Sequence, residues 1–161
     1  MPHETTLGWP ARQMYSRSHP IGRTHIFAGF AGVLAALAGA EVDPAAKIEE
    51  CDVPGMEYLG YSATRQTWRL TAGGASLDCT IDPICASMGV SGENHSWVSK
   101  GLPDGVVVQG RALSSGRQPG SAHLTIEGVD AERAAVLSER FKSAFGRILS
   151  DEELEQELGE R

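Results

Sequence analysis

The residues best suited to chemistry lie close together near the middle of the chain. Cys79, Asp82, Cys85, Glu93 and His95 fall within one short stretch. Thiolate, imidazole and carboxylate groups are the usual ligands of zinc, but structural sites commonly place their cysteines only about two to four residues apart. Here five residues lie between Cys79 and Cys85. A metal site formed by Cys79, Cys85 and His95 is therefore a hypothesis, while an ordinary buried thiol at Cys79 is favoured because free cysteines are so often buried.

The same stretch could also supply a nucleophile and its base. Cys85 would attack a substrate and His95 would take its proton, as in other thiol enzymes. The sequence identifies no third group that would orient the histidine. A thiol-dependent or metal-dependent enzyme centred on Cys79, Cys85 and His95 is therefore kept as an alternative, and the chain is more simply interpreted as a protein without catalytic activity.

A charge-free segment at residues 26–40 is the second notable feature. It predicts a helix from about His25 to Ala38 that ends at Gly39 and is apolar on all sides, which is typical of a helix covered on most sides. Gly29 and Gly32 each cost about 1 kcal/mol relative to Ala in a helix interior, so they indicate close approach by a neighbouring element or a ligand. Close packing within the domain is the favoured explanation.

A cavity beside this helix would suit a small hydrophobic ligand. The residues expected to line it are Phe27, Gly29, Phe30, Gly32, Tyr58 and Trp68.

The charge-free segment is too short to span a bilayer, which takes about 20 apolar residues. It also imitates the hydrophobic part of a signal peptide, because Arg17 and Arg23 precede it. The leader before it is interrupted by Pro10 and Pro20, which argues against that interpretation. We therefore expect a buried helix of a soluble protein and no membrane partner.

The composition of the chain limits which classes of molecule it is expected to bind. The chain has 161 residues, of which 41% are hydrophobic, enough for one domain with a single core. A formal net charge of -7 argues against binding to nucleic acid or to anionic lipid. Three cysteines are too few for a disulfide scaffold and favour the cytoplasm. Nothing in the sequence predicts a cofactor.

Short runs bounded by turn residues predict antiparallel strands. The runs are residues 47–51, 57–62, 67–71, 76–81, 106–111 and 122–128. Gly73-Gly74 predicts a tight hairpin, whereas residues 82–104 contain many glycines and prolines and predict a long loop. The expected fold is α+β, with short antiparallel strands packed on a buried N-terminal helix and an amphipathic C-terminal helix.

The predicted organisation has three parts: an extended N-terminal arm at residues 1–24, a single α+β domain at 25–149 and a short acidic helix at 150–161. Asp130 is a good N-cap for an amphipathic helix at about 131–147, and Ser150 with Glu153 forms a capping box. The arm and the acidic helix both need a surface to pack on, either in this domain, in a second copy or on a partner protein. A structural subunit of a larger assembly is therefore a third hypothesis.

Residues 24–59 carry a pattern of small residues in the order Ala28-Gly29-Phe30-Ala31-Gly32, Gly39, Glu41-Val42, Glu49-Glu50-Cys51, Gly55 and Tyr58. This pattern resembles the small-molecule-binding domain of the 4-vinyl-reductase type, found in bacteriochlorophyll-biosynthesis proteins and in sensor modules of bacterial activators. Leu59 and Thr24 stand where that family has cysteines, so its zinc site is not expected here. The leading hypothesis is a non-catalytic binding module, either a sensor for a small hydrophobic ligand or an accessory subunit. It depends on the apolar helix with glycine gaps beside a sheet, which can leave an apolar cavity, and on the absence of a catalytic constellation in the sequence.

Overall fold

The computed structural model describes residues 2–39, 43–52, 64–86 and 89–159, with 43–52, 64, 85–86 and 89–90 described by their backbone alone. Along the chain the elements are β1 (His3–Trp9), a 3-10 helix η1 (Ala11–Tyr15), α1 (Arg23–Ala38), β2 (Asp43–Asp52), β3 (Thr64–Ala72), β4 (Ala75–Ala86), β5 (Gly89–Lys100), β6 (Val107–Ser115), β7 (Gly120–Glu127), α2 (Ala131–Ser143) and α3 (Asp151–Gly159). The predicted α+β class is confirmed.

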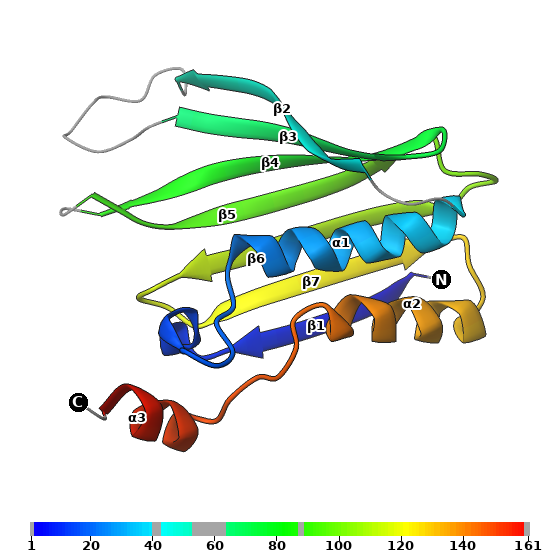
Figure 1. The fold of residues 1–161 in the computed structure, drawn as a ribbon. Coiled ribbons are helices and arrows are strands. Elements are labelled where there is room, and N and C mark those ends of the chain that lie inside the picture. The colour runs from blue at the N-terminus through cyan, green and yellow to red at the C-terminus, as the bar shows by residue number, and fades with distance from the viewer. Residues whose placement is uncertain (1, 40–42, 53–63, 87–88, 160–161) are drawn as a thin grey trace.

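The strands of the described residues form one antiparallel sheet in the order β1-β7-β6-β5-β4-β3-β2. Helices α1 and α2 lie side by side on one face, as Figure 1 shows. The strands are 7 to 12 residues long, so the expectation of short strands is wrong. Among the described helices, none combines the length and apolarity required to cross a bilayer.

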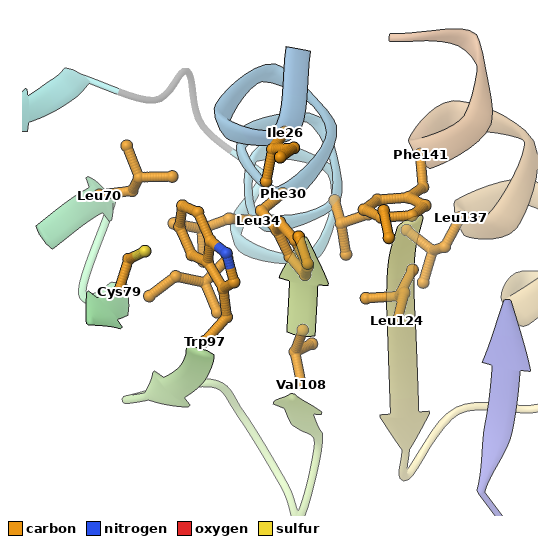
Figure 2. Close-up of a cluster of buried hydrophobic side chains, with 14 of the residues drawn as sticks. Ile26, Phe30, Leu34, Leu70, Cys79, Trp97, Val108, Leu124, Leu137 and Phe141 are labelled. Atoms are coloured by element: carbon orange, nitrogen blue, oxygen red, sulfur yellow. The ribbon is translucent and has the colours of Figure 1, made fainter. Parts of the chain in front are cut away.

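The core lies between the sheet and the two helices (Figure 2). Phe30 of α1 stands over Gly110 of β6, where an added Cβ would come within 2.2 Å of the Phe30 ring. Along α1 the buried positions are Ile26, Gly29, Phe30, Val33 and Leu34. The other apolar side chains of the helix are partly buried, except for the exposed Ala28.

Residues 82–104 do not form the predicted long loop. Strand β4 continues to Ala86, and β5 begins at Gly89 and pairs with it, with Pro83 opposite Glu93. The prediction was wrong because the residues of β5 that face the core include polar ones, Glu93 and His95, so the alternation typical of a half-buried strand was hidden.

The two ends of the chain pack within the same fold. Strand β1 pairs with β7, and Trp9 at its end is buried, so the residues described in 1–24 contribute an edge strand of the sheet. Gln13 of η1 is fully buried. Its side chain donates to the carbonyl oxygens of His19 and Arg147, at 2.9 and 3.0 Å, and accepts from the backbone N–H of Leu149 at 2.9 Å.

Helix α3 packs against η1 and the loop that follows it (Figure 1). Leu154 is buried, and the Glu157 carboxylate accepts hydrogen bonds from the hydroxyls of Ser16 and Ser18 and from the backbone N–H groups of Arg17 and Ser18.

The predicted helix boundaries are confirmed where capping chemistry set them. Gly39 ends α1 in the left-handed conformation, with φ 66°. The Asp130 side chain accepts from the backbone N–H of Arg133, and Ser150 and Glu153 form the reciprocal capping box. Helix α2 ends at Ser143, earlier than predicted, and Gly146 at φ 68° turns the chain toward α3.

Candidate functional site

A group of polar and aromatic side chains lies on the helix-facing side of the sheet, next to the N-terminal half of α1. We call it the polar-aromatic cluster, and its members are Arg23, Phe27, Gln66, Trp68, Glu93, His95 and Trp97. The first two come from α1, the next two from β3 and the last three from β5.

Strand register explains why these side chains meet. Successive side chains of a strand point to opposite faces, so Glu93, His95 and Trp97 share the face that packs on the helices. Trp68 of β3 and Trp97 of β5 both lie opposite Cys79 of the intervening strand β4. This row therefore carries a thiol between two indole rings.

An ion pair ties α1 to the sheet at one end of the cluster. The Arg23 guanidinium donates to both Glu93 carboxylate oxygens, from Nε at 2.7 Å and from Nη2 at 2.6 Å. Gln66 Oε1 accepts from Arg23 Nη1 at 3.3 Å and from the Trp68 indole N–H at 3.2 Å. The two hydrogen bonds fix the orientation of the guanidinium group in addition to pairing its charge with that of Glu93.

Glu93 is also the partner of a buried histidine. His95 Nε2 lies 2.9 Å from Glu93 Oε1, and His95 is only 1% exposed. Burial alone would raise the pKa of Glu93, but the hydrogen bonds from Arg23 and His95 and the nearby positive charge lower it to about 2. The hydrogen bond to Glu93 in turn raises the pKa of Arg23. Both groups are therefore ionised at neutral pH.

Two polar atoms of the cluster have no hydrogen-bond partner in the described part of the chain. They are Nδ1 of His95 and Nε1 of Trp97, and both residues are buried. Buried polar atoms in folded proteins are nearly always paired, so each exception calls for an explanation such as a bound water or ligand.

Phe27 brings the aromatic rings of the cluster together. Its ring centroid lies 5.8 Å from that of Trp68, 6.0 Å from that of His95 and 5.4 Å from that of Trp97, each in an edge-on arrangement. Phe27 and Trp68 are only partly buried. The cluster thus combines exposed aromatic surface with unpaired buried polar atoms.

Cys79 and His95, two of the three predicted metal ligands, lie on the same face of neighbouring strands. Burial and the nearby negative charge of Glu93 raise the pKa of the Cys79 thiol well above its ordinary value, so it is protonated at neutral pH. A protonated thiol is a poor nucleophile and a poor metal ligand. The Cys85 side chain lies outside the described residues.

Within the part of the chain that the structure describes, no three His, Cys, Asp or Glu side chains are grouped as a metal site would need. The site of Cys79, Cys85 and His95 therefore stays a prediction.

The predicted ligand-binding residues divide into two groups. Phe27 and Trp68 belong to the cluster, whereas Phe30 stacks on Trp97 inside the core with ring centroids 4.5 Å apart. Gly29 faces the rings of Phe141 in α2 and of Phe145 just after that helix, and Gly32 faces the side chain of Arg140. These two glycines therefore allow α1 and α2 to approach closely. Tyr58 lies outside the described residues.

Reasoning from the sequence missed Arg23, Gln66 and Trp97 as members of the site. The available signal was the alternation Glu93-x-His95-x-Trp97, which places three unusual side chains on one face of a strand. Nothing in the sequence indicated that Arg23, at the start of a helix, would reach this strand.

A groove of about 600 Å³ lies on the opposite face of the sheet, over β1, β7, β6 and β5. Its polar lining includes Arg111, His123 and Glu4. His123 pairs across the strands with Thr6 at 2.7 Å and with Glu4 at 3.3 Å, and both contacts are at the surface. Such pairs are ordinary cross-strand contacts of an exposed sheet face, so the polar-aromatic cluster is the stronger candidate.

No protein-family model and no curated protein matches the chain. The resemblance of residues 24–59 to the 4-vinyl-reductase-type domain therefore stays a prediction. Much of that pattern, from Glu41 to Leu59, lies where the structure describes at most the backbone.

Proposed function

We propose that this chain binds a small, largely apolar molecule at the polar-aromatic cluster and catalyses no reaction on it. The observation that carries the proposal is the partly exposed aromatic surface of Phe27 and Trp68 beside a partly buried polar network. Small-molecule sites are typically lined by aromatic side chains and a few fixed polar groups. A sensor or an accessory subunit would use such a site.

The polar groups of the cluster support binding over catalysis. Arg23 and Glu93 neutralise each other, and the Cys79 thiol is protonated at neutral pH. A nucleophilic or general-base mechanism would need an activated group in reach of a substrate. The described cluster offers fixed charges and aromatic surface instead.

The contacts of the two termini give less support to the hypothesis that this chain is a structural subunit that binds its neighbours through its N- and C-terminal segments. Gln13 and Glu157 bind partners within the chain, and Leu154 is buried there. The N-terminal segment and the acidic helix thus already have the surface that each was expected to need. A homo-oligomer or a partner protein bound through the termini stays a prediction.

Toluene titration of the ¹⁵N-labelled protein tests the proposal by NMR. We expect saturable shifts of the Trp68 indole N–H signal and of amides around Phe27, because a bound ring alters the local magnetic environment. Trp68→Ala should weaken the binding of toluene at least fivefold. Val136→Ala, at a 62% exposed position of α2, is the matched control and should leave it unchanged. Toluene that shifts no signal in the cluster up to its solubility limit would contradict the proposal.

A further inference from the structure

The chemistry of the two unpaired atoms defines what a ligand of this site must offer. His95 Nδ1 and Trp97 Nε1 are buried in rings that both contact Phe27. Figure 2 shows Trp97 standing up from β5 into the core beneath α1. Neither atom has a protein partner in the described part of the chain, so a group from outside that part must supply any hydrogen bond.

The hydrogen bond to Glu93 determines which nitrogen of His95 carries the proton. The Glu93 carboxylate is held ionised by two-point contact with Arg23 and can only accept, so His95 Nε2 must donate to it. In the neutral ring the proton is then absent from Nδ1, which is left as an acceptor. The missing partner of Nδ1 is therefore a hydrogen-bond donor for the neutral ring and an acceptor for the protonated ring.

The requirement of Trp97 Nε1 does not depend on protonation. An indole N–H can only donate, so its missing partner is an acceptor. A hydroxyl group both donates and accepts, and it can therefore satisfy either atom.

Charged groups fit this position poorly. A carboxylate cannot donate to Nδ1 of a neutral His95 ring, and with either ring form it would be repelled by Glu93, which lies 2.9 Å from the other ring nitrogen. An ammonium group cannot accept from Trp97, and Arg23 already occupies the carboxylate. An ether oxygen can accept but cannot donate.

We infer that the ligand is a neutral apolar alcohol, whose hydroxyl group binds His95 Nδ1 or Trp97 Nε1 while its apolar part packs on Phe27 and Trp68. This inference rests on the proposed function, because it names the class of molecule that the same site takes. Its basis is the pair of unpaired buried atoms, which is separate from the exposed ring surface that carries the proposal of binding.

Three matched probes test the inference: toluene, benzyl methyl ether and benzyl alcohol. We expect benzyl alcohol to bind about tenfold more tightly than toluene, by calorimetric or NMR titration. Benzyl methyl ether should bind like toluene if the hydroxyl donates to His95 Nδ1, and like the alcohol if the hydroxyl accepts from Trp97 Nε1. On addition of benzyl alcohol, the ¹⁵N signal of His95 Nδ1 or the indole N–H signal of Trp97 should shift in the direction of a new hydrogen bond. These signals are read from the unmodified protein, so the test does not depend on a variant that folds.

Two variants refine the test. His95→Phe keeps a ring but removes Nδ1, and Trp97→Phe removes Nε1. At least one of them should lose the tenfold preference for the alcohol while still binding toluene. His123→Phe, on the opposite face of the sheet, is the matched control and should keep the preference.

The outcomes separate this inference from the proposed function. Toluene and benzyl alcohol that bind equally well would overturn the inference and leave the function standing. Probes that all fail to bind would overturn both. His95 and Trp97 signals that report an internal water, unchanged when the alcohol binds, would also overturn the inference.

Discussion

Glu93 connects three elements through one carboxylate. It accepts from Arg23 of α1 and from His95 of its own strand, and Arg23 in turn reaches Gln66 of β3. Loss of a buried charge leaves its partners unsatisfied, which usually costs more than the intact pair contributes. The residue is therefore a sensitive point for both stability and the geometry of the site.

Glu93→Gln should lower the free energy of unfolding by about 1.5 to 3 kcal/mol at pH 7, as measured by urea denaturation. The pKa of Glu93 is lowered from 4.5 to about 2 in the folded state. A carboxyl with a lowered pKa stabilises the fold above its unfolded pKa and loses that contribution as pH falls. The difference between the two proteins should therefore shrink between about pH 4.5 and about pH 2.

The pKa values of Asp78, Glu153 and Glu157 are also lowered. Their effects occur in both proteins and cancel in the difference. Glu4→Gln, at an exposed position, is the matched control and should change the unfolding free energy by less than about 0.5 kcal/mol. A Glu93→Gln protein as stable as the parent at pH 7 would show that the ion pair contributes nothing.

The sequence predicted single residues well where their chemistry acts locally. Gly39, Asp130 and the Ser150–Glu153 pair act within one turn of the backbone, and each was placed correctly. Arg23 acts across the fold, on a residue 70 positions later in the chain. Which residue pairs with another so far along the chain depends on the topology of the fold, and a local sequence pattern does not reveal it.

At the scale of elements, Gln13 holds the C-terminal segment to the N-terminal one. Its side-chain amide makes three hydrogen bonds, two to backbone groups of Arg147 and Leu149 in the segment before α3. The amide is fully buried, so its removal leaves these backbone groups without partners.

Gln13→Ala should therefore release α3 from η1. We expect faster hydrogen exchange at the amides of α3 and a loss of about 2 to 3 kcal/mol in the free energy of unfolding. Gln118→Ala, at an exposed position between β6 and β7, provides the same substitution without buried contacts and should change neither quantity. Exchange of α3 at the parental rate in the Gln13 variant would show that other contacts hold the helix.

Elements with a clear apolar period were easier to predict than β5. The spacing of Ala134, Leu137 and Phe141 predicted α2, and those residues are its buried face. In β5 the inward positions hold Glu93 and His95, which form a hydrogen bond with each other. Because polar residues stand at inward positions where apolar ones are usual, the sequence pattern revealed neither the strand nor the centre of the candidate site.

At the scale of the whole molecule, the sheet is built from neighbours in sequence except at one pair. Strands β2 to β7 pair in order, whereas β1 pairs with β7, for example Thr5 opposite Leu124. Helix α1 connects β1 at one edge of the sheet to β2 at the other (Figure 1). No local pattern identifies the edge strands of a sheet, and residues 1–24 therefore resembled a separate arm.

This topology predicts that β1 joins the sheet late in folding. Long loops cost entropy before their contacts form, whereas the β3–β4 hairpin is closed by Gly73-Gly74. Leu77→Ala in β4 should mainly slow folding, and Leu7→Ala in β1 should mainly speed unfolding, as measured by stopped-flow kinetics. A folding rate lowered equally by both substitutions would place β1 in the folding nucleus instead.

The pairing of β1 with β7 also has a consequence during synthesis. A ribosome adds about 5 to 20 residues per second, so β1 emerges roughly ten seconds before its partner strand is complete. During that interval β1 and Trp9 lack the strand with which β1 pairs, whereas α1 can already pack on β3 and β4 once these are made. Chaperones that bind exposed apolar segments at the exit tunnel would therefore meet this protein through β1 and Trp9.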